Sequence, residues 1–178
     1  MDTLKPISKP VALKAFENLD RHLKETLTLY VGGGTSMILA HGYALATSDV
    51  DALPKQVSFD EIDAHVKAVA MELGLPADWL NPYFGSFTHV LPADFTDRLV
   101  LVFSGRYLSV QALGREDMLI MKCFAHRPKD IGHARALLKA GADTGIVERA
   151  IESCRKRGVP GADTALDFLD ELLEEMEP

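Results

Sequence analysis

The sequence predicts an α/β fold, of the α+β kind, in which a small mixed sheet is flanked by helices and followed by a helical C-terminal region. In residues 1–113, segments with helical periodicity alternate with short apolar runs that are typical of strands. From residue 115 onward only the helical period occurs. The 178 residues are enough to bury a substantial core. We therefore expect an α/β core at 1–113, with the helical region 114–178 packed against it as one unit.

The first half of the chain supplies both kinds of element in alternation. The clearest helix is expected at 59–73, because Ser58 and Glu61 have the spacing of a capping box and Gly74 can end the helix in a left-handed conformation. Shorter helices and strands are expected from their apolar patterns: helices at 9–25, 35–42 and 76–80, and strands at 27–31, at the segment around 49–53, and at 87–91, 99–103 and 107–113.

The apolar periodicity of the second half predicts four helices, at 115–126, 128–140, 144–157 and 164–176. Pro128 is expected to open the second of them, because proline is tolerated only in the first turn of a helix. Asp143 and Asp163 are candidate N-caps, and Gly141 and Gly158 fit just past helix ends. Cys123 and Cys154 fall within apolar helical patterns, which predicts two buried free thiols rather than a disulfide.

The most informative motif is a run of three glycines, Gly32 to Gly34, between an apolar strand and a helix that opens near Thr35. Glycine lets backbone amides approach a phosphate closely, because no Cβ intervenes. A P-loop is disfavoured because no Gly-Lys-Ser/Thr follows, and a dinucleotide fingerprint is disfavoured because its third, correctly spaced glycine is missing. A glycine cluster alone is most often a turn.

Asp49 and Asp51 form a second motif, Ser48-Asp49-Val50-Asp51-Ala52-Leu53. Residues two apart on a strand point to the same side, so the two carboxylates can share one divalent cation. Taken alone, such a pair is usually a solvated strand end or a helix cap. Together with the glycine run, it predicts a site for a metal-bound triphosphate.

This order of motifs resembles the signature of the polymerase-beta-like nucleotidyltransferase superfamily. Val31 to Gly34 supply its first part and Asp49 to Asp51 its second, with a spacer slightly longer than the common pattern. Two further segments resemble narrower groups. Residues 75–81, which contain Trp79-Leu80-Asn81, are similar to a segment of uncharacterised bacterial nucleotidyltransferase-like proteins. Residues 116–130 are similar to an element of abortive-infection toxins of the AbiEii type.

The resemblance implies transfer of a nucleoside monophosphate from a nucleoside triphosphate to an RNA, protein or small-molecule acceptor, with an antitoxin as a further partner if the chain is toxin-like. It implies Mg²⁺ held by Asp49 and Asp51 as catalytic carboxylates, with Asp130 as a further catalytic residue. The nucleotide would be bound by the glycine turn, by hydroxyls that follow it and by two cations: Gly33, Gly34, Thr35, Ser36, Lys122 and Arg127. For Lys122, a lysine that reaches from a partly buried helix to water is the structural alternative.

The sequence departs from the superfamily at the third carboxylate. The expected strand at 107–113 offers Ser109 and Gln111 where active members commonly carry an acid. Either Asp94 or Asp97 folds back, or Asp130 substitutes, or the chain is a catalytically degenerate module that binds a nucleotide or a partner. His133 stands where related families often carry Asp, and a zinc site made by His126, Asp130 and His133 is a minor alternative.

Bulk properties narrow the class of partner. The formal net charge of −7 argues against a broad nucleic-acid footprint, since such binding relies on cations that neutralise phosphates. Neither a signal peptide nor an apolar segment of membrane-spanning length is visible, so we expect a cytoplasmic protein without a membrane partner.

Overall fold

The computed structural model describes residues 6–43 and 46–176, which form two compact units. The first unit contains the residues up to Ser86 together with Leu99–Leu113. The second contains Phe87–Arg98 and the residues from Gly114 onward. The chain therefore passes from the first unit to the second, back to the first and again to the second.

A five-stranded mixed sheet forms the centre of the first unit. Its strands lie in the order β3-β2-β1-β5-β4, with β1 parallel to β5 and antiparallel to β2. β3 runs parallel to β2, and β4 runs antiparallel to β5. The bounds are Leu27–Val31 for β1, Val50–Pro54 for β2, Leu80–Asn81 for β3, Val100–Ser104 for β4 and Leu108–Ala112 for β5. The predicted small mixed sheet is confirmed.

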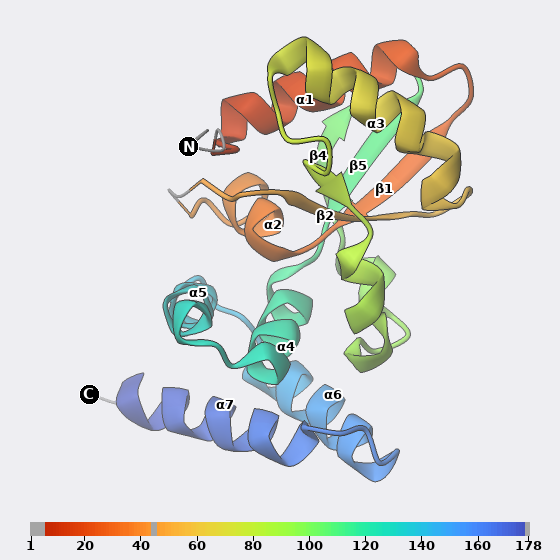
Figure 1. The fold of residues 1–178 in the computed structure, drawn as a ribbon. Coiled ribbons are helices and arrows are strands. Elements are labelled where there is room, and N and C mark those ends of the chain that lie inside the picture. Colours follow the sequence, from red (N-terminus) through yellow and green to blue (C-terminus); the bar gives the residue numbers. More distant parts are fainter. Residues whose placement is uncertain (1–5, 44–45, 177–178) are drawn as a thin grey trace. The chain divides into compact units, whose positions relative to one another are not determined.

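The two faces of this sheet differ in polarity. Alternate residues of the central strands, such as Val31, Ala52 and Val110, are fully buried in the core that includes α1 (Lys9–His22) and α3 (Phe59–Leu73). Both helices lie along one side of the strands in Figure 1. Because successive strand residues point to opposite faces, the other face carries Asp51 of β2 and Gln111 of β5. The candidate carboxylate is thus on the face away from this core.

The second unit is helical. It contains α4 (Arg115–Ala125), α5 (Pro128–Lys139), α6 (Thr144–Lys156) and α7 (Ala162–Met176). Residues 87–98, which include the end of the 3-10 helix η1 (Tyr83–Val90) and all of η2 (Phe95–Arg98), belong to this unit.

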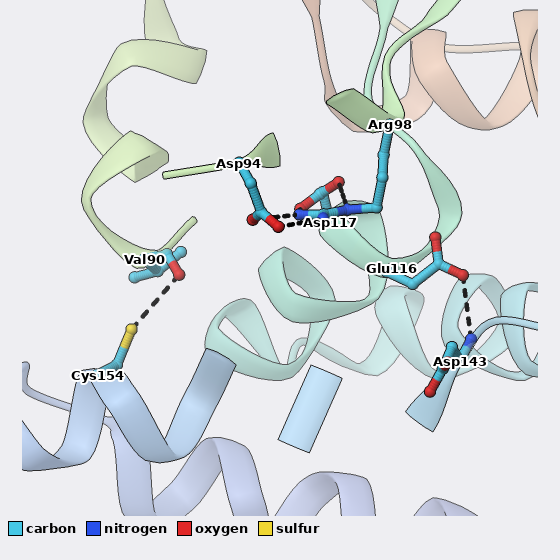
Figure 2. A network of polar contacts seen from close by, with 7 residues as sticks. All are labelled: Val90, Asp94, Arg98, Glu116, Asp117, Asp143 and Cys154. Carbon is cyan, nitrogen blue, oxygen red and sulfur yellow. Dashed lines mark hydrogen bonds and ion pairs between the residues drawn. The ribbon is translucent and has the colours of Figure 1, made fainter. Parts of the chain in front are cut away.

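Polar contacts fasten this segment to the helices, as Figure 2 shows. Arg98 donates to both carboxylate oxygens of Asp117 on α4, at 2.9 and 2.8 Å, and forms an ion pair with Asp94. The thiol of Cys154 on α6 donates to the carbonyl oxygen of Val90 at 3.4 Å. Residues 87–98 therefore belong structurally with the helices, although they precede β4 and β5 in the chain.

Several local signals are confirmed. α3 spans 59–73 with the Ser58/Glu61 capping box, and Gly74 ends it with φ +63°. Pro128 begins α5, and the Asp143 side chain accepts from the Ile146 amide at the start of α6. Past the ends of α5 and α6 stand two positive-φ glycines, Gly141 and Gly158, and both cysteines are buried free thiols.

Other predictions were wrong. Residues 76–80 form a turn that leads into β3 rather than a helix, because Leu80 and Asn81 pair with β2. The apolar run 87–91 is not a strand, since residues up to Val90 lie in the 3-10 helix η1. α2 is Gly33–Leu39 rather than 35–42, so two of the glycines lie in its first turn. Asp163 is inside α7, which begins at Ala162, and is not its N-cap. Within the described ranges, no helix has the length and apolar character needed to cross a bilayer.

Candidate functional site

The carboxylate of Asp51 lies directly against the glycine turn. A Cβ at Gly33 would overlap with Oδ2 of Asp51, and the φ of Gly33, +57°, is itself one that other residues rarely adopt. The amide of Gly32 donates to the carbonyl oxygen of Asp51 at 3.0 Å, which fixes the backbone of β2 against the turn. The fold therefore brings together the two motifs that the sequence predicts to cooperate, and glycine is required at position 33 for two separate reasons.

Replacing Gly33 by alanine tests this contact. The backbone effect alone should lower the free energy of unfolding by about 1–2 kcal/mol, because a Cβ disfavours the left-handed conformation. The overlap with the Asp51 carboxylate should lower it further. Gly42→Ala is the matched control, because Gly42 has φ +66° and a Cβ added there would contact none of the described residues. Thermal unfolding should show a clearly larger decrease in melting temperature for Gly33→Ala. Equal decreases would mean that the carboxylate does not occupy this position in solution.

Asp49 is fixed by side chains rather than by the sheet. It precedes β2 by one residue, and its carboxylate accepts from Asn81 Nδ2 at 2.9 Å and from Ser48 Oγ at 3.2 Å. Asn81 is opposite Asp51 in the register of β2 and β3, so these two side chains share a face of the sheet. Since Asn81 reaches Asp49, the Asp49 carboxylate lies on that face too. Sequence reasoning missed Asn81 as a site residue, although it is the last residue of the Trp79-Leu80-Asn81 segment.

The two hydroxyls after the glycines are engaged within the protein. Thr35 is 1% exposed and donates to the carbonyl oxygen of Asp49 at 3.2 Å. Ser36 is fully buried and donates to the carbonyl oxygen of Leu113 at 3.0 Å. In this arrangement they join the turn to β2 and to the end of β5. Their binding of phosphate stays a prediction, and it would require each hydroxyl to change its acceptor.

Lys122, Arg127 and Asp130 form one cluster within the second unit. Lys122 Nζ donates to Asp130 Oδ1 at 2.8 Å, and both side chains are buried, while Arg127 Nε donates to Oδ2 at 2.7 Å. Arg127 itself is half-exposed. Asp130 also accepts from the Arg127 backbone amide at 3.2 Å and so caps the start of α5.

Burial and the charges of the cluster together shift the pKa values of Asp130, Lys122 and His133. Burial by itself would raise the pKa of Asp130, but the hydrogen bonds from Arg127 and Lys122 outweigh burial and keep that pKa below its ordinary value. Burial lowers the pKa of Lys122, and Asp130 opposes this shift only in part. Burial, with the nearby charge of Lys122, also lowers the pKa of His133. The cluster thus combines two cations with one carboxylate, a balance that suits an anionic ligand.

A third carboxylate does not join Asp49 and Asp51 in the described part of the chain. No group of three or more acidic, histidine or cysteine side chains is placed to hold a metal ion among residues 6–43 and 46–176. β5 presents Ser109 and Gln111 on the face that carries Asp51. Asp94 is paired with Arg98 in the second unit, and Asp97 lies on η2. His126 ends α4 in a left-handed conformation, with Nδ1 near the Phe124 carbonyl oxygen.

The donor set around Asp49 and Asp51 suits a hard divalent cation. Both side chains offer carboxylate oxygens, and Mg²⁺ is typically held by one or two carboxylates together with substrate phosphates and water. Among the described residues, the Asp49 carboxylate accepts from Asn81 and Ser48, and both of these donors are neutral. These residues fit Mg²⁺, which stays an expectation at this site.

A family model described as "nucleotidyltransferase of unknown function (DUF6036)" matches residues 12–154. The matched range includes the glycine turn, both aspartates and the Lys122–Asp130 pair. No curated protein matches the chain, and no solved structure does.

Proposed function

Because the chain belongs to this family of nucleotidyltransferases of unknown function, we propose that it transfers a nucleoside monophosphate from a nucleoside triphosphate to an acceptor, with Mg²⁺ bound by Asp49 and Asp51. The observation that carries the proposal is the contact of the Asp51 carboxylate with Gly33. This contact puts a carboxylate oxygen, the kind of donor that Mg²⁺ prefers, beside backbone that can approach a phosphate without hindrance from a side chain.

Each residue of the first unit has a defined task in this proposal. Gly33 and Gly34 would let the triphosphate approach the backbone, and Thr35 and Ser36 would supply hydroxyl donors to its oxygens. Asp49 and Asp51 would hold the cation, which when bound supplies charge to offset that developing on the leaving pyrophosphate. The attacking oxygen of the acceptor must then lie in line with the α-phosphorus.

We propose that two cations of the α4–α5 cluster bind phosphate oxygens. Lys122 and Arg127 are the two that the resemblance implies, and both donate to Asp130. A direct catalytic role for Asp130 stays a prediction, and it would require this buried carboxylate to exchange at least one of its two cationic partners. Its contacts favour an indirect role, in which Asp130 orients Lys122 and Arg127.

For the acceptor we propose RNA or protein, in a cytoplasmic and toxin-like setting with an antitoxin partner. The support is the similarity of residues 116–130 to the AbiEii-type element. The net charge of −7 favours recognition of a local feature of the acceptor over a long stretch of nucleic acid.

Label transfer tests the proposal directly. The full chain is incubated with each of the four triphosphates, labelled at the α-phosphorus, together with cellular RNA or protein and Mg²⁺. We expect label on an acceptor with one nucleotide, none in the presence of EDTA, and none when the label is at the γ-phosphorus, because only the monophosphate is transferred. Transfer of γ-label would indicate phosphoryl transfer instead and would contradict the proposal.

The competing function is a nucleotide- or partner-binding module that has lost catalysis. Ser109 and Gln111 on β5, on the face that carries Asp51, are the observation that favours it, since neither can act as a carboxylate base. This alternative predicts Mg²⁺-dependent binding of a triphosphate without transfer of α-label to any acceptor.

A further inference from the structure

We propose that Asn81 is a positioning residue that holds the Asp49 carboxylate toward the cation site. This inference rests on the proposed function. The need for such a residue follows from the place of Asp49 in the chain. Asp51 is within β2, whose backbone is fixed on both sides by β1 and β3. Asp49 precedes the strand, so the direction of its side chain depends on its own contacts.

The orientation of the Asn81 amide is defined by its two partners. The backbone amide of Tyr83 can only donate, and it contacts Asn81 Oδ1 at 3.0 Å. The Asp49 carboxylate can only accept when ionised, and Asn81 Nδ2 lies 2.9 Å from its Oδ2. A flipped amide would lose both hydrogen bonds. Asn81 therefore presents an N–H group to Asp49 and brings no charge of its own to the carboxylate.

The neighbours of Asn81 make it a rigid support. Trp79 is fully buried and donates from Nε1 to the carbonyl oxygen of Val66 on α3 at 2.9 Å, while its own carbonyl accepts from the Val50 amide at 2.6 Å. Leu80 is buried in the core and pairs with Val50. Three successive residues thus contact α3 through Trp79, the core through Leu80 and the Asp49 carboxylate through Asn81. A ligand-orienting role of this kind typically changes metal affinity by 10–100-fold.

The test measures Mn²⁺ affinity by electron paramagnetic resonance of the free ion. We expect Asn81→Ala to weaken Mn²⁺ binding by roughly 10–100-fold. The matched control is Asn18→Ala, since Asn18 is the only other asparagine of the chain and its Nδ2 also donates to a carboxylate, that of Glu72, at 2.9 Å. This control should leave Mn²⁺ affinity unchanged. A purely structural role would lower the melting temperature of Asn81→Ala and leave the affinity of the folded protein at the wild-type value, which would overturn the proposal.

Asn81→Asp provides an independent variant. The 2.9 Å between Asn81 Nδ2 and Asp49 Oδ2 is close to the spacing of two adjacent oxygens in an octahedral shell with bonds of about 2.0–2.1 Å. A carboxylate at position 81 should therefore repel Asp49 in metal-free buffer and add a ligand when metal is present. We expect a lower melting temperature without Mn²⁺ and a larger stabilisation by Mn²⁺ than in the wild type. A melting temperature that falls equally with and without Mn²⁺ would place position 81 away from the cation.

Failure of this inference is distinct from failure of the proposed function. If the wild type binds Mn²⁺ and Asp51→Asn abolishes binding, the cation site stands, and unchanged affinity in Asn81→Ala rejects the role of Asn81 alone. If the wild type binds no Mn²⁺, both proposals fail together.

Discussion

Asp51→Asn should reduce the rate of nucleotidyl transfer by about three orders of magnitude or more. A bound divalent cation contributes several kcal/mol to stabilising the charge of the transition state, and each 1.4 kcal/mol corresponds to about tenfold in rate. The amide has nearly the size of the carboxylate and fits the same space beside Gly33, but it lacks the charge that would hold the proposed cation. The rate is measured as α-label transferred per unit time at saturating triphosphate.

Stability measurements separate this chemical effect from unfolding. The rates of Asp51→Asn and wild type are compared at a temperature at which thermal unfolding shows that both proteins are folded. Asp60→Asn is a suitable control, because Asp60 is an exposed residue in the first turn of α3. Transfer by Asp51→Asn within tenfold of the wild-type rate would show that the reaction does not depend on this carboxylate.

Elements with strong local signals were predictable from the sequence. α3 has the predicted bounds because the Ser58/Glu61 capping box, the apolar period and Gly74 all act within a few residues of one another. β3 was not predictable, because two residues have no period and their strand conformation comes from pairing with Val50 and Asp51, about 30 positions earlier in the chain. Likewise, the apolar content of 87–91 indicates burial but cannot distinguish a strand from a 3-10 helix.

For the candidate site, the sequence predicts residue types more readily than their contacts. The two-residue spacing of Asp49 and Asp51 and the glycine run were visible directly. The contact between Asp51 and Gly33 depends on the antiparallel register of β1 and β2, which no local pattern specifies. The bond from Asn81 to Asp49 joins residues 32 positions apart and required β3 to be placed first.

The Lys122–Asp130 pair shows the same limit within a shorter stretch. Side-chain pairs can be read from sequence at spacings of three or four within one helix. Lys122 and Asp130 are eight residues apart on two helices, and they meet because His126, with φ +33°, ends α4 and Pro128 begins α5 in a new direction. A lysine that stands alone in an apolar stretch of the sequence thus has a buried partner in the fold.

Asp130→Ala should lower the free energy of unfolding by about 3–5 kcal/mol, because it leaves the Lys122 ammonium buried without its counter-charge. For a chain of this size, the melting temperature should fall by roughly 6–20 °C. Arg127→Ala is the control, since it removes the half-exposed partner and leaves the buried pair intact. Its effect should be about 1 kcal/mol or less. An equal loss in both variants would contradict a buried ion pair.

The pH dependence of Asp130→Ala should identify the buried lysine as the cause. Without Asp130, the pKa of Lys122 in the folded state should lie further below its ordinary value of 10.5. Between that lowered value and the unfolded value, the unfolded chain binds more protons than the folded one, so stability rises with pH. The difference in stability between wild type and Asp130→Ala should therefore narrow as pH rises from 7 toward 10. A constant difference would point to lost packing or capping instead.

The double variant Lys122→Met/Asp130→Ala connects this pair to function. Replacing both members of a buried ion pair by uncharged residues is often close to neutral, so most of the lost stability should return. If the stable double variant also binds a fluorescent triphosphate much more weakly than the wild type, the pair is not needed for folding and Lys122 contributes its charge to the ligand. Unchanged affinity would instead leave Lys122 as a residue of the helical core.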